Sequence, residues 1–375
     1  MNPATFLRGL CAVVCMFMAE MAPVWAQATA LQAEPAAEIP IEQLFRKSAY
    51  QHIVLSPDQK FMAAVTPVNG RQNLIVIDLD KRAGAVLTGL TDIDVSWIYW
   101  ANNQRLLFTT GDQQGLELRS TGGLFAIDRD GKNDSSLVNP FLAGSSISLV
   151  WRQTSVIGRV KGSPDEVYVS ANDRSESTQD VYRMNVVTGR KTLVNASSPG
   201  HVLRWVLDRD GVPRAALSMD AKRRRWWFSH LDGGQWKTLA GWDERLEGVV
   251  IPEAFDPENP RAMYVASNVG RDTLAWFRFD LDGGKLGELV YGDDRHDVGS
   301  FHLLGEDRDE GGRLIFDGSE EEPGKLLGLR YQADKPRSVW LDETARKTQA
   351  MVDAALPSTF NRFDVTQTRT LVASH

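Results

Sequence analysis

The amino-acid sequence predicts an all-β protein, a β-propeller of about six to seven four-stranded blades. The first supporting observation is a recurring unit, in which an S-P-D-like turn precedes a short apolar strand and a second strand ends in an Asp/Gly turn. The second is the regular spacing of these units, which suits propeller blades. The third is that no run alternates strands with long helices through residue 340, which argues against a parallel α/β sheet.

The turns that open the units share a composition. Ser56-Pro57-Asp58, Ser163-Pro164-Asp165 and Asp256-Pro257-Glu258 are the best copies. Proline fixes a turn before the strand, and Asp-Gly steps favour hairpins because glycine accepts positive φ. Alternating apolar residues then place one strand face in the core between blades. The predicted unit starts lie near residues 55, 100, 163, 208, 255 and 312.

The C-terminal part departs from this pattern. Residues 341–356 contain no turn residue and are rich in Ala, Glu, Lys, Arg and Met, which predicts one short helix ended by Pro357. Residues 358–375 then predict a turn and one more strand. A final strand without a hairpin partner leaves an exposed edge. We therefore expect an incomplete last blade and a chain that stops within a repeat.

Residues 1–26 are predicted to be a signal peptide. Arg8 gives a positive start, and the apolar residues 10–19 are too few to span a bilayer, so no stable membrane insertion is expected. Cleavage can follow Ala26 or Ala28, and the protein is expected to be exported, periplasmic or secreted. A lipoprotein anchor on Cys11 or Cys15 is the alternative, although neither cysteine follows a convincing lipobox.

The rest of the chain divides into two parts. Residues 27–40 are rich in Ala, Glu and Pro and predict a flexible lead-in. Residues 41–375 predict the propeller, and its first stretch, residues 41–50, is amphipathic. Both cysteines of the sequence lie in the signal peptide, so no disulfide is expected to hold the mature chain together.

The charge of the chain bears on its partners. The formal net charge is -7, which disfavours nucleic acid because phosphate binding needs a basic surface. One basic run, residues 222–225, precedes Trp226 and Trp227. This run is compatible with nucleic acid or an anionic membrane surface, but the acidity of the whole chain favours a strand with alternating exposed Arg and buried Trp.

No catalytic residue is predicted. The G-x-S-x-G elbow of α/β-hydrolases is absent, because Gly144-Ser145-Ser146 and Gly299-Ser300 lack the second glycine. A Ser-His-Asp triad assembled from distant positions is the alternative, since geometry rather than order defines a triad. The available histidines are His52, His201, His230, His296, His302 and His375.

No metal, cofactor or amine site is predicted, because a turn or loop explains each candidate segment at least as well. Residues 128–131 (DRDG) resemble the opening of a calcium loop, but Asn139 stands where a bidentate Glu is needed, which favours a hairpin turn. Residues 320–322 (EEE) are suited to attract a substrate amine, or form a solvated turn before Pro323. A polar cluster with possible metal ligands, which a solvated loop explains equally well, consists of Asp293, Asp294, His296 and Asp297. Trp242-Asp243 matches the WD dipeptide once only.

Several segments resemble a known family. Phe45-Arg46-Lys47, residues 53–58 and residues 73–78 resemble the start of the propeller domain of exported prolyl-oligopeptidase-like (S9-type) serine peptidases, which include dipeptidyl-peptidase and acylaminoacyl-peptidase types. Residues 87–108 and 340–357 look similar too, so the resemblance covers residues 40–360. The S-P-D motif is shared with TolB-type propellers. Gln59 replaces the glycine that usually follows it.

The resemblance implies a function that the residues alone do not. In this family the propeller precedes an α/β-hydrolase domain with a Ser-Asp-His triad and limits access to it, so that only short peptides react. No catalytic residue of that domain matches a position here. We therefore expect a substrate-gating, non-catalytic propeller whose hydrolase domain is missing or separately encoded. The alternatives are a stand-alone periplasmic TolB-like propeller that binds or scaffolds, and a hydrolase that uses residues of the central channel.

Overall fold

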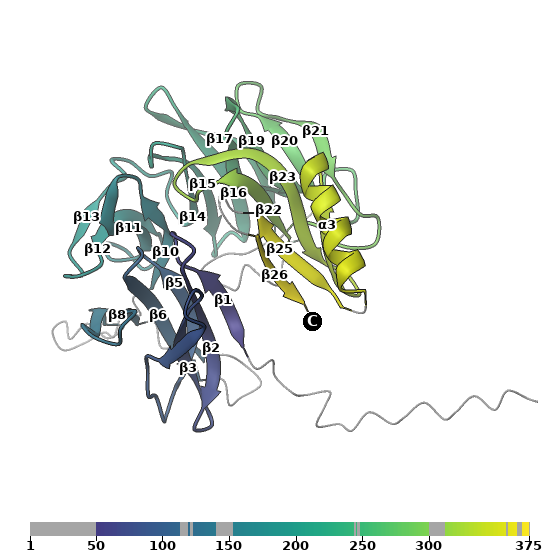
Figure 1. Ribbon diagram of the computed structural model, residues 1–375. Helices are drawn as coiled ribbons and strands as arrows, with labels where there is room; N and C mark the ends of the chain where they lie inside the picture. Colours follow the sequence, from purple (N-terminus) through teal and green to yellow (C-terminus); the bar gives the residue numbers. More distant parts are fainter. Residues whose placement is uncertain are drawn as a thin grey trace, which may run out of the picture. The chain divides into compact units, whose positions relative to one another are not determined.

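The computed structural model describes residues 50–112, 119–120, 123–139, 153–243, 245, 248–299, 312–357, 359–365 and 370–374. These residues form a six-bladed β-propeller of antiparallel sheets, as the repeats predict (Figure 1). The predicted signal peptide and lead-in, and residues 41–49, lie outside the described residues. None of the described helices is long and apolar enough to cross a membrane.

Six successive sheets form the blades. Blade 1 contains β1 (Gln51–Leu55), β2 (Phe61–Val68), β3 (Arg71–Asp78) and β4 (Ala83–Val86). Blade 2 contains β5 (Asp94–Trp100), β6 (Arg105–Asp112), β8 (Leu124–Asp128) and β9 (Ser135–Val138), and the short β7 (Arg119–Ser120) also pairs with β6. Blade 3 contains β10 (Thr154–Val160), β11 (Ser163–Ala171), β12 (Asp180–Asn185) and β13 (Lys191–Leu193).

The second half of the chain repeats this order. Blade 4 contains β14 (Val202–Leu207), β15 (Pro213–Asp220), β16 (Arg225–Asp232) and β17 (Gln235–Asp243). Blade 5 contains β18 (Val250–Asp256), β19 (Asn259–Ser267), β20 (Ala275–Asp280) and β21 (Lys285–Tyr291). Blade 6 has three strands, β22 (Arg313–Gly318), β23 (Pro323–Gln332) and β24 (Pro336–Trp340).

The recurring turns lie inside the blades and not between them. Ser56-Pro57-Asp58 separates β1 from β2. Five of the six predicted unit starts accordingly fall near the end of a blade's first strand or after it, whereas the start near residue 312 coincides with β22. The reason is that the strand after the turn has the stronger apolar signal: the middle of β2 is buried, whereas β1 has no fully buried residue. Within the turn, the Ser56 hydroxyl donates to Asp58 (2.7 Å) and accepts from the Phe61 amide (3.0 Å). Gln59 has a φ of 58°, which explains why glycine is usual there.

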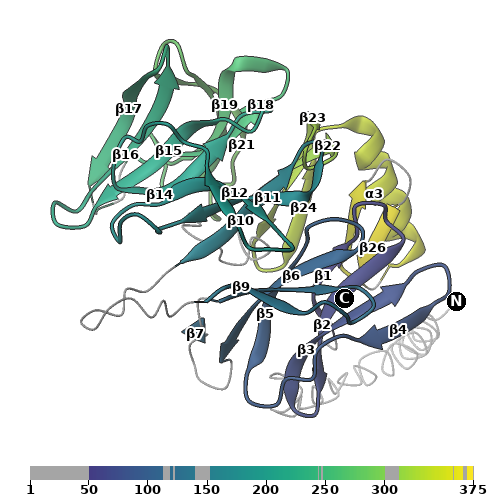
Figure 2. The ribbon, with the colours of Figure 1, turned by 90° about the vertical axis from the view of Figure 1, so that its left-hand side faces the viewer.

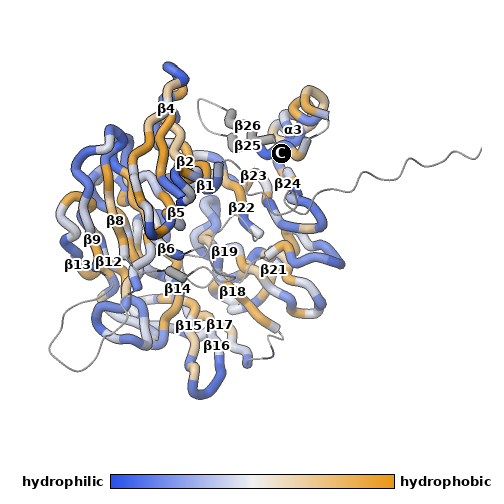
Figure 3. The backbone as a smooth tube through the Cα atoms, turned by 90° about the horizontal axis from the view of Figure 1, so that it is seen from below, coloured by the Kyte–Doolittle hydropathy of each residue, from blue (hydrophilic) through white to orange (hydrophobic). Residues whose placement is uncertain are grey.

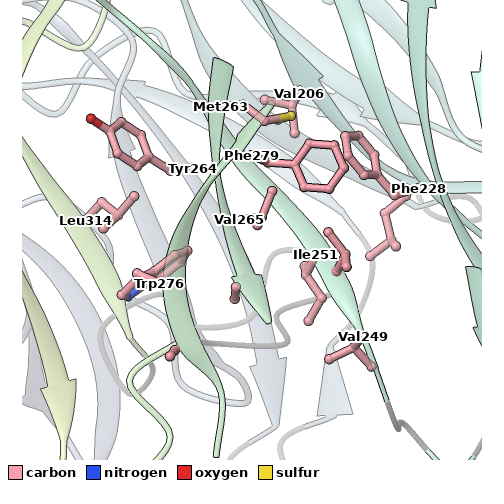
Figure 4. Close-up of a cluster of buried hydrophobic side chains, with 14 of the residues drawn as sticks. Val206, Phe228, Val249, Ile251, Met263, Tyr264, Val265, Trp276, Phe279 and Leu314 are labelled. Carbon is pink, nitrogen blue, oxygen red and sulfur yellow. The ribbon is translucent and has the colours of Figure 1, made fainter. Parts of the chain in front are cut away.

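The apolar cores lie between neighbouring blades, and the strands carry most of the hydrophobic residues (Figure 3). The largest core joins blades 4, 5 and 6. There Phe228 of β16 meets Phe279 of β20 edge to face, with ring centroids 5.4 Å apart (Figure 4). Both rings are almost fully buried. Each of blades 1 to 5 therefore buries a face against the blade that follows it in the sequence, as expected for radial repeats.

The predicted helix is present as α3 (Glu343–Ala355). It begins after Asp342, whose carboxylate accepts the Ala345 amide (2.9 Å), and such an N-cap stabilises the first turn. Trp340 at the end of β24 stacks on Phe363, with ring centroids 4.6 Å apart. This contact belongs to a small apolar core that joins blade 6, α3 and the C-terminal segment (Figure 2).

The prediction of a lone last strand is wrong. β25 (Asn361–Val365) pairs with β26 (Thr370–Ser374) in an antiparallel hairpin. The sequence predicts a single strand here because no Gly or Pro separates β25 from β26. The hairpin is a separate two-stranded sheet, and blade 6 keeps three strands, so the expectation of an incomplete last blade is confirmed.

Core packing between blades predicts a large effect of a single truncation. Phe228→Ala should lower the free energy of unfolding by about 3–5 kcal/mol, because it removes a fully buried ring from the largest core. Urea denaturation of the purified chain measures this change. Leu289→Ala on β21, where the side chain is 45% exposed, is the control and should cost well under half as much. Equal losses in the two variants would contradict this packing.

Candidate functional site

The first strands of the blades bring polar residues from distant parts of the sequence together. In a propeller the blades surround a central channel. The first strands of neighbouring blades touch each other, as β1 does with β5 and β14 with β18. Tyr99 lies on β5 and Arg159 on β10, and residues 319–322, the turn between β22 and β23, approach both. We call this turn the acidic turn. Together with Tyr99, Arg159 and Lys161 it forms the cross-blade cluster.

Arg159 is the centre of the cross-blade cluster. Its guanidinium lies 3.0 Å from the carboxylate of Glu320 and forms a hydrogen bond and an ion pair with Glu321. It also donates to the Trp100 carbonyl (3.4 Å) and lies over the ring of Tyr99, 5.8 Å from the ring centroid. The side chain is only 15% exposed. A guanidinium with this set of acceptors is held in one orientation.

Tyr99 supplies a second donor beside Arg159. Its hydroxyl donates to Glu320 (2.6 Å), and its ring stacks on Trp97 with centroids 5.7 Å apart. Burial and the nearby Glu320 carboxylate raise the pKa of Tyr99 well above its usual value, so the hydroxyl keeps its proton and remains a donor. At the edge of the cluster, Lys161 pairs with Glu322.

Ion pairing keeps Arg159 and Glu321 in their charged forms. Burial opposes the charge of Arg159, but Glu320 and Glu321 outweigh it, so the pKa of Arg159 lies above its usual range. Burial likewise opposes ionisation of Glu321, and the hydrogen bond and charge of Arg159 outweigh this effect, so the pKa of Glu321 is lowered. Arg159 is a cation and Glu321 an anion at neutral pH.

Close approach of the acidic turn requires a small residue on β10. A Cβ at Gly158 would lie 3.1 Å from the carboxylate of Glu320, which is closer than most side chains tolerate. Glycine at this position therefore allows Glu320 to lie against the strand beside Arg159.

The sequence predicts only part of the cross-blade cluster. The prediction that residues 320–322 form a turn between strands is confirmed, but the turn is not fully solvated, because Glu320 and Glu321 contact Arg159. Since these carboxylates already have a cation, the structure does not favour the alternative that they gather a substrate amine. Arg159 and Tyr99 were missed, because they lie far from the acidic turn in the sequence. Gly158, between Ile157 and Arg159, was a weak local signal.

The DRDG segment lies in a hairpin turn. Residues 128–131 connect β8 and β9, and the Gly131 amide donates to the Asp128 carbonyl (2.8 Å). The Asp128 carboxylate accepts from buried Arg105 (2.7 Å) instead of pointing toward a shared centre. Within the described ranges, no group of three or more His, Cys, Asp or Glu residues is arranged to hold a metal ion.

The polar cluster of residues 293–297 forms hydrogen bonds and ion pairs with neighbouring segments. Asp293 accepts from the Arg295 amide (2.8 Å) and the Tyr331 hydroxyl (2.9 Å), and these bonds hold its pKa well below the usual value. Asp297 accepts from the Leu274 amide (2.6 Å). The remaining two members of the cluster are Asp294, which pairs with Arg271, and His296, which contacts Asp293.

The basic run differs from its prediction. Residues 222–224 form the turn between β15 and β16, and only Arg225 lies on a strand. Trp226 and Trp227 are consecutive and both half-buried, so Arg and Trp do not alternate between surface and core. The physical reason is that Asp220 accepts the amides of Lys222 and Arg223 and closes the turn before the strand begins. Trp226 stacks on buried Trp242.

The histidines and serines considered for a triad are only partly described. Gly144-Ser145-Ser146, Ser300, His302 and His375 lie outside the described residues. His230 and His201 each face an aromatic ring, and His296 contacts Asp293. Burial and Arg214 lower the pKa of His230, so it is neutral at neutral pH.

The fold is a β-propeller, and the sequence is similar to that of a known peptidase. No family model matches the chain. The chain is 24% identical over 314 residues, 80% of its length, to dipeptidyl aminopeptidase BIII from Pseudoxanthomonas mexicana. This homology confirms the predicted resemblance to the propeller of prolyl-oligopeptidase-like (S9-type) serine peptidases. The chain spans only 41% of that relative.

Two solved structures are similar to the chain at low sequence identity. An oligogalacturonate lyase in complex with manganese is 11% identical, with a TM-score of 0.49 and 80% of each chain covered. A puromycin hydrolase is 12% identical, with a TM-score of 0.46, and the match covers 88% of this chain and 50% of that one.

The charge pairing of Glu321 predicts a pH-dependent contribution to stability. Its pKa is lowered in the folded state, so its contribution is present above the usual value of 4.5 and is lost as the pH falls through the folded value. Glu321→Gln should lower the free energy of unfolding by about 1–2 kcal/mol at pH 7.

Urea denaturation between pH 7 and pH 3 tests this expectation. The difference between Glu321→Gln and the unmodified chain should shrink progressively below pH 4.5. Glu288→Gln, at an exposed position on β21, is the matched control and should change little at any pH. A Glu321→Gln difference that stays constant with pH would contradict the pairing with Arg159.

Proposed function

We propose that the chain is the substrate-gating, non-catalytic propeller portion of a prolyl-oligopeptidase-like serine peptidase that acts on short peptides. The observation that carries this proposal is the homology to dipeptidyl aminopeptidase BIII over 80% of the chain. The absence of a G-x-S-x-G elbow from the sequence supports a non-catalytic role. The partner in this proposal is an α/β-hydrolase domain.

The physical basis of gating is size exclusion. The blades pack on each other through apolar cores, and in this proposal the central channel of the propeller admits an extended peptide but not a folded protein. The first strands carry the residues that such a peptide would meet. Tyr99 and Arg159 are two of them.

A stand-alone periplasmic propeller of the TolB-like type is the second candidate, serving as a binding or scaffold protein. Contacts of Arg159 and Tyr99 with the acidic turn favour it, because they link blades 2 and 3 to blade 6 without any other domain. This candidate also needs no catalytic partner.

Activity assays separate these functions. The purified mature chain is incubated with chromogenic dipeptide and Xaa-Pro substrates and with a fluorophosphonate that labels active serines. We expect neither turnover nor labelling. Both together would overturn the proposal and support a hydrolase that uses residues of the channel.

The partner domain is tested by the DNA downstream of the gene. The gating proposal predicts a G-x-S-x-G segment there, in frame or after a frameshift. Co-expression of that segment with this chain should give peptidase activity on short peptides and none on a folded protein such as native ribonuclease. Unrelated downstream sequence would contradict gating and favour the stand-alone binding protein.

Export of the protein is a further part of the proposal. The signal-like residues 1–26 support it, and mass spectrometry of the protein from the periplasmic fraction or the medium tests it. We expect a mature N-terminus at Gln27 or Thr29. A chain that stays in the cytoplasm with residues 1–26 intact would contradict export, and a lipid on Cys11 or Cys15 would assign the lipoprotein alternative.

A further inference from the structure

The acidic turn takes a different course from the equivalent turns of other blades. In blades 1 to 3 the turn after the first strand contacts the same turn of the next blade. The Asp58 amide donates to the Asn103 side chain (2.9 Å), and the Asn102 side chain donates to the Pro164 carbonyl (2.8 Å). The acidic turn belongs to blade 6 but contacts Arg159 and Tyr99 of blades 3 and 2, which do not follow it in the ring.

The cationic side of the cross-blade cluster is built without the acidic turn. Arg159 stands on β10, paired with Val167 of β11, and its guanidinium is anchored by the Trp100 carbonyl. Tyr99 stands on β5, and Trp97 stacks on its ring. These contacts come from blades 2 and 3 alone. The backbone positions of Arg159 and Tyr99 therefore do not depend on the acidic turn.

The anionic side is a backbone turn closed by hydrogen bonds between Ser319 and Glu322, and its carboxylates are held at Arg159 by their charges. The Glu322 amide donates to the Ser319 hydroxyl (3.1 Å), which shapes the turn, and the β22–β23 ladder ends at Gly318 and Pro323. Glu320 and Glu321 have side chains 38% and 22% exposed. The three carboxylates of the turn form ion pairs with the two cations of the cluster, Arg159 and Lys161. The charge of Arg209 also lowers the pKa of Glu322. Such a turn can be displaced by a better anion.

We propose that Arg159, Tyr99 and Lys161 form a binding site for the carboxylate of a short peptide, and that the acidic turn is its internal, competing occupant. The chemistry is specific. A guanidinium binds a carboxylate through two parallel hydrogen bonds, and Glu320 and Glu321 now occupy that position. The Tyr99 hydroxyl is a further donor, and Lys161 adds charge at the edge. This inference deepens the proposed function, since it supplies the contact that would retain a peptide in the channel.

Binding of labelled peptides to the isolated chain tests the site independently of any hydrolase partner. Fluorescence anisotropy is measured with fluorescein-Gly-Gly-Pro-Ala carrying either a free carboxylate or a C-terminal amide. The double variant Glu320→Gln with Glu321→Gln should bind the free acid at least about tenfold more tightly than the unmodified chain does, because the competing occupant is neutralised. The amide should bind weakly to both proteins.

Three variants serve as controls for the binding measurement. Arg159→Gln added to the double variant should abolish the preference for the free acid. Arg159→Lys, which keeps the charge but loses the paired hydrogen bonds, should lose most of that preference and serves if Arg159→Gln does not fold. Glu288→Gln should leave peptide binding unchanged. A third peptide, an amide that ends in Asp, distinguishes a C-terminal carboxylate from an acidic side chain. Tight binding of this peptide supports the site with the side chain as the source of the carboxylate.

Two results would overturn the inference. One is equal affinity of the double variant for the free acid and the amide. The other is a preference for the free acid that survives Arg159→Lys and Arg159→Gln. Neither result affects the gating proposal, because that proposal is decided by turnover with the hydrolase partner.

Discussion

Burial of blade faces against neighbouring blades is the constraint on which this structure depends. A twisted antiparallel sheet of three or four strands has two faces, and water cannot cover both when the middle strands are apolar. The residues of β2, β6, β15 and β19 are accordingly buried in their centres. Every core except the C-terminal one joins residues of at least two blades. The first strands of the blades then surround the central channel, as is usual in a propeller.

The same constraint explains what the sequence predicted well. The recurring turns and alternating strands are local signals, so they predicted about six to seven blades, of which the structure has six. Pro357 was likewise a local signal for the end of the helix. Five of the six predicted unit starts were misplaced, and in blade 1 the reason is that β1 is less buried than β2. Likewise the hairpin of β25 and β26 was read as one strand, since its turn has no glycine or proline.

The cross-blade cluster was beyond prediction from sequence. Arg159 and Glu321 are 162 residues apart, and no spacing rule connects two such positions. Only closure of the blades into a propeller brings β5, β10 and the acidic turn together. The run of three glutamates was noticeable, but its function depended on which cations the fold would place beside it. Removing one partner of a buried ion pair is destabilising, because the other charge is then left buried and unpaired. The intact pair adds little net stability, because both charges lose their hydration when they are buried.

The central claim is that the acidic turn of blade 6 binds Arg159 across the propeller. A double-mutant cycle on the free energy of unfolding tests it most directly, with Arg159→Gln, Glu321→Gln and the double variant measured at pH 7 by urea denaturation. If the two side chains interact as described, the cycle gives a coupling energy of about 1–3 kcal/mol. Additive effects of the two substitutions, with a coupling near zero, would contradict the cross-blade contact and the carboxylate site built on it.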